Sequence, residues 1–305
     1  MRGVQESYLV NRTAGSGGLK AEIHRGGVDD VVEVRLTRED RKIRINGQEA
    51  GSGQLPGLAA MGLFTPADLS LVQGSPQERR RFVDLEVSAL NRSYAGIWRR
   101  YQRALWQKNK AVAIRADRGP LTSVWDEQLA FYGAKIIVLR NLWLASFARA
   151  AGDLYRDISG GGRLTLELTR SFAGAQALGE GEVEESMAAA LAQGQREPAP
   201  AGVAVGPHRD DLALSIDGMN ARYTSSQGEQ RTVVLALRLA GHALRREELG
   251  EDPVLLLDDA FYELDEGRRE RLLRVLSGAG QVLATSVSVP GEGRVFRIEG
   301  GKISG

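Results

Sequence analysis

Four acidic residues lie within one short stretch of the sequence, PVLLLDDAFYELD, which runs from Pro253 to Asp265. Asp258 and Asp259 directly follow an aliphatic run, although loss of hydration makes a charge costly there. This pattern is typical of a strand that is buried in a parallel sheet and ends in acids at the carboxyl edge. At that edge Asp258 would hold Mg²⁺, and Asp259 would orient or deprotonate a water molecule that attacks a γ-phosphate. The alternative is a buried strand whose terminal acids cap the next helix.

A second candidate site, SSQGEQR at 225–231, opens an apolar helix upstream of the acidic stretch. Gly228 permits close approach of another backbone, and the free N–H groups of a helix N-terminus attract anions. The same residues also fit a capping box, in which Ser226 and Glu229 satisfy the first turn of the helix. Taken alone, the capping box is the simpler interpretation. The acidic stretch that follows favours an anion site.

The composition excludes several classes of chemistry. The chain has 305 residues, 42% of them hydrophobic, a net charge of +1 and no cysteine. The absence of cysteine excludes disulfides and thiolate chemistry, and it fits a reducing cytosol. The histidines His24, His208 and His242 are far apart in sequence, which argues against a zinc site. No apolar run is long enough to span a bilayer, so we expect a cytoplasmic protein without a membrane partner.

Positive charge is concentrated between Pro76 and Ala150, where 14 Lys or Arg residues occur against 6 Asp or Glu residues. All four tryptophans fall in the same segment. Such a surface suits a polyanion, because lysine and arginine displace counterions from phosphates. The alternative is a solvated helical region with the tryptophans in its core. The candidate DNA contacts are Arg79, Arg80, Arg81, Arg99, Arg100, Arg103, Lys108 and Lys110. Of these, Arg99, Arg103 and Lys110 fall near one face of a helix and could follow phosphates without reading base sequence.

The elements that must position these residues begin with strands and continue with helices. Alternating residues predict strands at 31–37 and 42–47, and Asn46-Gly47 predicts a tight turn. Helical spacing starts near Gln77 and continues to Phe147. The glycine-rich break at 158–163 ends this helical block.

Beyond that break the sequence returns to an α/β order. The predicted elements are the strand RLTLELT, a surface helix within 173–202, a strand at 212–217, the helix opened by SSQGEQR, the buried strand VLLLDD, a helix at 266–276, the strand QVLATS and a hairpin-like tail. We therefore predict an α/β body that is split by a mostly helical insertion, lobe II. The predicted segments are 1–72, 73–202 and 203–305.

Taken in this order, the motifs resemble a known family. Residues 226–230 resemble the signature motif of ABC-type ATPases, Glu263-Leu264-Asp265 resembles their D-loop, and Thr285 stands where many of them place a switch histidine. Three further stretches resemble the RecF family: QGSPQERRRFVD (73–84), RRYQRALWQKNKAV (99–112) and VGPHRDDLALSIDG (205–218). The likeness extends from about Ile23 to Ser286.

The resemblance implies a P-loop NTPase body of the ABC and SMC-head type, truncated at the N-terminus, with a helical lobe set against it. It implies ATP and Mg²⁺ as cofactors, Asp258 and Asp259 as catalytic residues and Asp258 as the metal ligand. The implied nucleotide contacts are Ser226, Gly228, Gln230, Asp265 and Thr285.

The function implied by the resemblance lies in DNA replication, repair, recombination and the SOS response. Members of the family form an ATP-dependent homodimer, bind single-stranded or gapped DNA and support loading of the recombinase with other recombination mediator proteins. The family is a slow DNA-dependent ATPase. Asp259 is one methylene shorter than the usual glutamate, which is consistent with slow turnover. For His208 a structural hydrogen bond is favoured over catalysis, and for Asp210 and Asp211 a nucleotide contact and an ion pair both stay open.

One expected motif is missing from the sequence. No GxxxxGK[ST] loop occurs, and the pair Gly301-Lys302 is followed by Ile303. Three hypotheses follow: a fragment or a start codon assigned too late, a non-hydrolysing DNA- or partner-binding module that has lost nucleotide binding, or a chain that contributes its signature motif to a complete protomer. We favour the first, and in that case apolar sheet surface is expected to be exposed.

Overall fold

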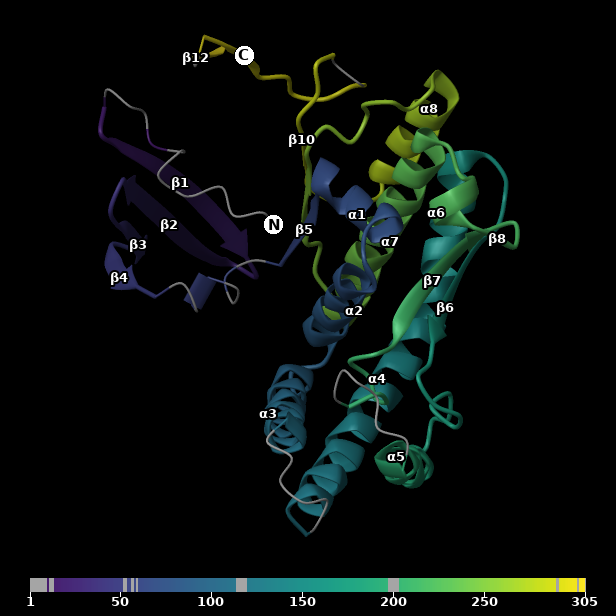
Figure 1. Cartoon of the computed structure of the whole chain (residues 1–305). Coiled ribbons are helices and arrows are strands. Elements are labelled where there is room, and N and C mark those ends of the chain that lie inside the picture. The colour runs from purple at the N-terminus through teal and green to yellow at the C-terminus, as the bar shows by residue number, and fades with distance from the viewer. Residues whose placement is uncertain are drawn as a thin grey trace.

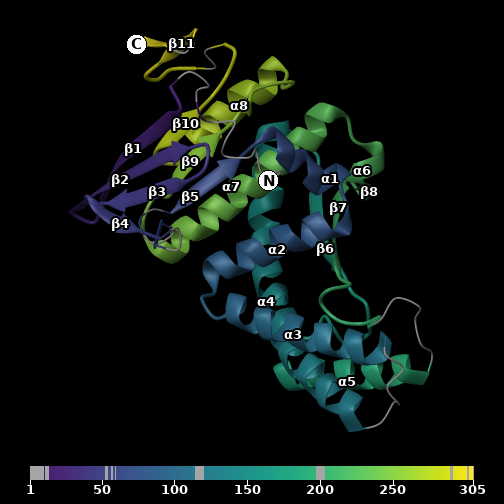
Figure 2. The same cartoon turned by 60° about the vertical axis from the view of Figure 1, so that its left-hand side comes forward.

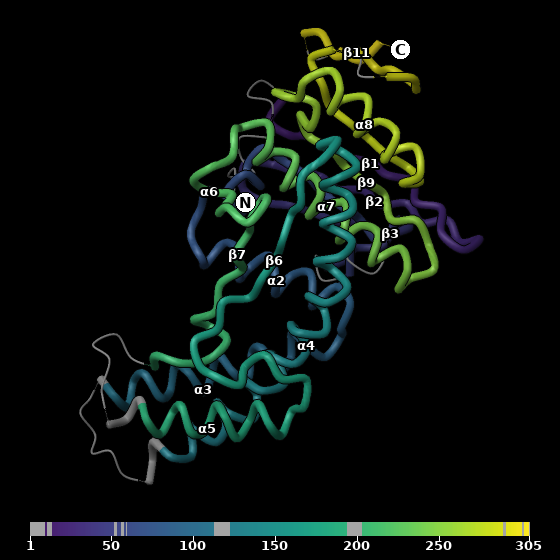
Figure 3. Tube along the Cα trace, turned by 90° about the vertical axis from the view of Figure 1, so that its right-hand side faces the viewer, coloured from purple at the N-terminus to yellow at the C-terminus, as the bar shows by residue number. Residues whose placement is uncertain are grey.

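The long helix α4 (Pro120–Ser159) joins the two ends of an elongated molecule (Figures 1 and 3). The computed structural model describes residues 10, 14–51, 54–55, 58, 60–113, 120–196, 203–288, 291–300 and 302–304. Near one end of α4 lie a parallel sheet and helices α7 (Gln227–Leu249) and α8 (Glu266–Leu276), and at the other end lie α3 (Tyr94–Ala113) and α5 (Glu180–Arg196). None of the described helices combines the length and apolarity needed to cross a bilayer.

The parallel sheet has the strand order β10–β9–β5. Its strands are β5 (Met61–Phe64), β9 (Val254–Leu257) and β10 (Val282–Ala284), and both outer strands run parallel to β9. Leu255 and Leu257 on one face of β9 are buried, whereas Val254 and Leu256 on the other face are half-buried, so burial on both faces is incomplete. Because parallel strands share one direction, their carboxyl ends meet at a single edge, which positions the candidate acids.

An antiparallel sheet lies to one side of the parallel sheet (Figures 1 and 2). Its strands are β1 (Ser16–Arg25), β2 (Val28–Thr37), β3 (Arg41–Ile45) and β4 (Gln48–Ala50), in that order. Asn46 and Gly47 have positive φ angles of 51° and 79°, so the predicted turn joins β3 to β4. Leu19 of β1 and Leu283 of β10 are 67% and 54% exposed.

The helical part of the chain packs around α4. A short connection through η3 (Pro66–Leu69) and α1 (Ser70–Gln73) leads from β5 to α2 (Pro76–Leu90) and α3. Helices α3 and α5 both pack on α4. In its core Trp143 stacks on Phe147 with ring centroids 4.4 Å apart. The interpretation that tryptophans fill the core holds for Trp143, whereas Trp106 is 58% exposed.

A third sheet crosses a predicted segment boundary. Strand β6 (Leu164–Thr169) pairs antiparallel with β7 (Asp211–Ile216), and β7 pairs with β8 (Met219–Asn220) before α6 (Ala221–Thr224). The sheet therefore joins residues on both sides of position 202. The predicted tail hairpin is formed by β11 (Arg297–Glu299) and β12 (Lys302–Ser304).

Candidate functional site

Asp258, Asp259 and Thr285 meet at the carboxyl edge of the parallel sheet. The Asp258 N–H donates to Phe64 O and the Thr285 N–H donates to Leu257 O, both at 2.9 Å, so the ladder continues past each strand end. The Thr285 hydroxyl donates to Asp258 Oδ1 at 2.7 Å and accepts from the Asp259 N–H at 3.1 Å. One hydroxyl thus contacts the side chain of Asp258 and the backbone of Asp259.

Arg231 supports the unusual backbone at Asp259. Asp259 has a left-handed φ of 50°, which costs a non-glycine residue about 1–3 kcal/mol. Arg231 Nη1 donates to Asp259 O at 2.7 Å, and the guanidinium lies 5.4 Å from the Tyr262 ring centroid. Sequence reasoning missed this residue, although an arginine directly before the apolar run TVVLAL is a signal that it has a buried partner.

The carboxyl edge offers oxygen ligands of the kind that Mg²⁺ prefers. Asp258 and Asp259 are exposed, so their carboxylates are accessible to a solute. No group of three or more histidine or acidic side chains surrounds a cation position within the described residues. Mg²⁺ commonly binds one or two carboxylates and takes its remaining ligands from water and phosphate. The residues present therefore fit the metal and water half of a nucleotide site, whereas the sequence has no motif for the phosphate-cradling half.

The N-terminus of α7 forms the capping box that the sequence predicts. The Ser226 N–H and hydroxyl donate to Glu229 Oε2, both at 2.8 Å, and Ser226 Oγ accepts from the Glu229 N–H at 3.4 Å. The hydrogen bond from the Ser226 N–H holds the pKa of Glu229 below its usual range. A Cβ at Gly228 would lie 3.4 Å from Glu263 O. Gly228 thus permits a close approach, and its neighbours in the same chain are Arg268 Nη1 of α8, 3.0 Å from that Cβ, and the loop that precedes α8.

The structure gives Gln230 and Asp265 internal partners. Gln230 is 7% exposed; its Nε2 donates to Ser225 O at 3.1 Å, and its Oε1 accepts from Gln73 Nε2 at 2.7 Å. Its amide therefore faces inward, away from the solvent that a nucleotide would occupy. Asp265 caps α8 by accepting from the Arg268 N–H at 2.9 Å, which lowers the pKa of this carboxyl. Its side chain stays exposed and accessible.

His208 has a structural role, as favoured from the sequence. Its Nε2–H donates to Val203 O at 3.0 Å, which leaves Nδ1 to accept from the Tyr101 hydroxyl at 2.6 Å. Burial lowers the pKa of His208 to about 4. The ring is therefore neutral at physiological pH.

Asp210 and Asp211 both form ion pairs, of which those of Asp210 are buried and that of Asp211 is partly buried. Asp210 is fully buried and accepts from Arg170 Nη1 at 2.8 Å and Arg140 Nη1 at 3.4 Å. Asp211 accepts from Arg79 Nε and Nη2, both at 2.8 Å. These two carboxylates thus connect the start of β7 to α2, to α4 and to Arg170, which follows β6.

The basic candidates divide into buried and exposed residues. The side chains of Arg79 and Lys108 are 9% and 7% exposed, and they pair with Asp211 and Asp126. We therefore no longer assign Arg79 to a DNA surface, because its charge is already neutralised inside the molecule. Arg80 is half-buried and donates to Asp210 O at 2.8 Å. The exposed candidates are Arg81, Arg99, Arg100, Arg103 and Lys110.

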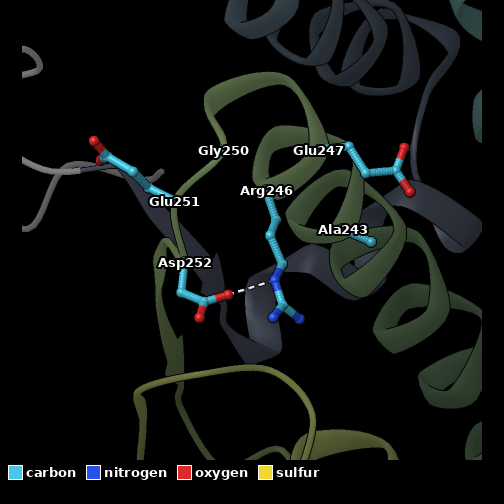
Figure 4. A pocket seen from close by; sticks show the side chains of 6 residues that line it. All are labelled: Ala243, Arg246, Glu247, Gly250, Glu251 and Asp252. Atoms are coloured by element: carbon cyan, nitrogen blue, oxygen red, sulfur yellow. Dashed lines mark ion pairs between the residues drawn. The ribbon is translucent and has the colours of Figure 1, made fainter.

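A hollow of ≈ 570 Å³ opens where α7 ends, at the amino end of the parallel sheet (Figure 4). Its lining residues are Ala243, Arg246, Glu247, Gly250, Glu251 and Asp252. Arg246 and Asp252 form an ion pair across it. The lining residues of the hollow come before β9 in the chain, whereas Asp258 comes directly after β9. The hollow and Asp258 therefore lie at opposite ends of this strand. The hollow is not the candidate nucleotide site.

Comparison with known proteins finds relatives that align over most of this chain. No family model matches the sequence. The DNA replication and repair protein RecF of Pelotomaculum thermopropionicum is 37% identical over 314 residues, which cover 99% of this chain and 86% of the relative. The RecF of Deinococcus radiodurans is 36% identical over 289 residues, which cover 94% of this chain and 77% of that protein.

Solved structures confirm the predicted fold class. The recombination mediator protein RecF-ATP of the RecFOR pathway matches with a TM-score of 0.81 and 27% identity, over 100% of this chain and 83% of that one. An SMC head bound to the C-winged helix domain of ScpA matches with a TM-score of 0.54 and 12% identity, over 95% and 73% of the two chains. The second likeness shows the fold alone. The body is therefore an α/β fold of the ABC and SMC-head type with a helical lobe.

Proposed function

The chain belongs to the RecF family of DNA replication and repair proteins, and on that premise we propose that it binds single-stranded or gapped DNA in an ATP-dependent manner. It would act as a homodimer with other recombination mediator proteins, support recombinase loading and contribute to the SOS response. The observation that carries the nucleotide part is the contact of Thr285 with both Asp258 and Asp259 at the carboxyl edge of the sheet.

Each residue at this edge has a distinct role in the proposed site. Asp258 would hold Mg²⁺, and Asp259 would orient the attacking water. Thr285 would fix the Asp258 carboxylate and the backbone of Asp259. When bound, Mg²⁺ neutralises charge on the phosphates. Ser226 and Asp265 would face the nucleotide of the second protomer. Support for ATP as the ligand comes from the related RecF-ATP structure.

The proposed DNA contacts are exposed arginine and lysine side chains of α2 and α3. Arg81 lies on α2, while Arg99, Arg103 and Lys110 share one side of α3. Arg80 of α2 is half-buried, and its guanidinium donates to the backbone of Asp210, whose side chain forms the buried ion pairs. Phosphate contacts of this type position a protein on DNA without reading base sequence.

A second candidate function is a DNA- or partner-binding module that does not hydrolyse nucleotide. The sequence favours it at one point, because no GxxxxGK[ST] loop occurs. The inward position of Gln230 favours it too, since the amide is already bonded to Gln73 and Ser225.

Equilibrium dialysis with labelled ATP distinguishes the two candidates. We expect the wild-type chain to bind Mg-ATP saturably and Asp258→Asn to lose that binding. Asp252→Asn is the matched control, because it removes an acid of the same type at the other end of β9. Wild-type protein that binds no Mg-ATP would contradict the ATP-dependent function and leave the second candidate. Equal binding by wild type and Asp258→Asn would contradict the assigned role of Asp258.

A further inference from the structure

Trp106 is a large aromatic side chain that the core leaves in solvent. Of the four tryptophans, Trp143 is buried and Trp98 and Trp125 pack against the core, whereas Trp106 is 58% exposed. Its place on α3 is therefore not explained by packing. An amphipathic aromatic ring in this position is available to a ligand.

The surroundings of Trp106 are cationic. Helix α3 contains no acidic residue, and the spacing of Arg99, Arg103, Trp106 and Lys110 places them along one stripe of its surface, here called the α3 stripe. Lys110 Nζ lies 5.1 Å from the centroid of the Trp106 ring. Within the described part of the chain, no carboxylate pairs with the three cations of the stripe. Lys108, which is buried, pairs with Asp126 instead.

We infer that the α3 stripe is a binding site for unpaired nucleotides, in which a base stacks on Trp106 and Arg99, Arg103 and Lys110 contact the backbone phosphates. This inference rests on the proposed function and adds the residue that distinguishes single-stranded DNA from duplex. A base in a duplex is already stacked between its neighbours, so only an unpaired base presents its face to an indole ring. Base–aromatic stacking also tolerates any base, which suits a repair protein that reads no sequence.

The chemistry of the stripe favours a polyanion over a protein partner. A docking site for an apolar helix would place further large apolar side chains beside the tryptophan. In the α3 stripe the neighbours of Trp106 are cations instead, and their charges need an anionic counterpart. Alternating positive charge and an aromatic ring is the combination that binds single-stranded nucleic acid.

Fluorescence anisotropy with the full chain tests the inference on labelled single-stranded DNA and on a duplex of the same sequence. Trp106→Ala is expected to weaken single-strand binding about 5- to 150-fold, the range that one stacked base supplies, and to leave duplex binding unchanged. Trp106→Phe should restore most of the affinity, because a smaller ring still stacks. Arg103→Gln should weaken binding of both the single strand and the duplex. For the single strand, it should also make the dependence of log affinity on log salt concentration shallower by about 0.7.

Phe131→Ala is the matched control for the loss of an exposed aromatic residue. Phe131 lies on α4, is 44% exposed and has Lys135 Nζ 4.7 Å from its ring centroid. Its replacement should change neither affinity. Equal weakening of single-strand and duplex binding by Trp106→Ala, or no change at all, would overturn the inference alone. A wild-type chain that binds neither DNA would overturn the proposed function and the inference with it.

Discussion

His208 is held neutral because both ring nitrogens have partners and burial opposes a charge. The pKa falls from 6.5 to about 4 on folding. Between these values the unfolded chain binds more protons than the folded chain, so stability decreases as the pH falls from 6.5 to about 4. Below about pH 4 both states are protonated and this residue adds no further loss. The shift lowers the free energy of unfolding by at most about 3 kcal/mol, and this full loss is reached below about pH 4.

Replacing His208 tests that linkage. His208→Asn should make the free energy of unfolding less dependent on pH between 6.5 and about 4. Urea unfolding at several pH values measures the effect, and the comparison of slopes removes any constant loss caused by the mutation. Identical slopes for the two proteins would show that His208 titrates normally in the folded state.

Asp210 is expected to be far more important for stability than an exposed acid. Asp210→Ala leaves the buried charge of Arg170 uncompensated, whereas Arg140 keeps its ion pair with Asp84 at 2.7 Å. The loss should cost about 3–5 kcal/mol of the free energy of unfolding. Asp153→Ala is the control, because Asp153 pairs with Arg156 on the solvent side of α4 and should cost about 0.5 kcal/mol or less. Guanidinium unfolding of both variants provides the measurement. Similar decreases in the free energy of unfolding for the two variants would show that the buried ion pairs of Asp210 do not stabilise the fold more than an exposed pair does.

Single residues also show where sequence reasoning succeeds. Asp258 and Asp259 could be placed at the carboxyl edge of a parallel sheet because they directly follow a buried aliphatic run. The place of Thr285 followed only from the resemblance to ABC-type ATPases. The inward turn of Arg79 and Gln230 could not be foreseen, since their partners Asp211 and Gln73 are distant in sequence. A charged residue is predicted to be exposed by default, and only the fold reveals its buried partner.

At the scale of elements, Ser226 at the N-terminus of α7 has two roles: it caps the helix, and it is a proposed nucleotide contact. Two substitutions of Ser226 distinguish these roles. Ser226→Ala should cost about 1 kcal/mol of stability, because the cap is lost. Ser226→Asp should keep the cap and therefore the stability, but its charge would repel a phosphate at the same position. We expect it to abolish Mg-ATP-dependent dimers.

Light scattering of the Ser226 variants, with and without Mg-ATP, measures dimer formation directly. Thermal unfolding of the same samples reports the cap. Dimers of Ser226→Asp that form as readily as those of the wild type would assign Ser226 to capping alone.

Elements with local signals are predicted well. The capping box begins α7 at Gln227, the pair Asn46-Gly47 turns between β3 and β4, and helix α8 spans 266–276 as expected. Segment boundaries are harder, because they depend on long-range pairing. The ladder of β6 and β7 joins residues on both sides of the predicted boundary after position 202. The alternation of residues within a strand does not show which other strand it pairs with.

Buried charges also link the elements that flank the candidate site. Glu86 of α2 is 5% exposed at its side chain and pairs with Arg238 and Arg245 of α7. Arg238 also pairs with Asp68, in the segment that follows β5. Burial raises the pKa of Glu86, and the two arginines oppose that rise. Helix α7 is thereby fixed to α2, at the start of the helical lobe.

At the scale of the whole molecule, the proposed nucleotide and DNA sites lie on different parts of an elongated protein. Helix α3 lies at the end opposite α8 (Figures 1 and 3). Helix α4 connects the two ends, and α2 carries both Glu86 and the basic residues Arg80 and Arg81.

Binding of gapped DNA by the purified chain, with and without Mg-ATP, tests the central claim most directly. We expect saturable binding by the wild type that becomes tighter with Mg-ATP, and binding by Asp258→Asn that is the same in both conditions. Asp252→Asn should behave as the wild type does. Absence of saturable binding to gapped DNA, or wild-type binding that Mg-ATP leaves unchanged, would contradict an ATP-dependent DNA-binding function.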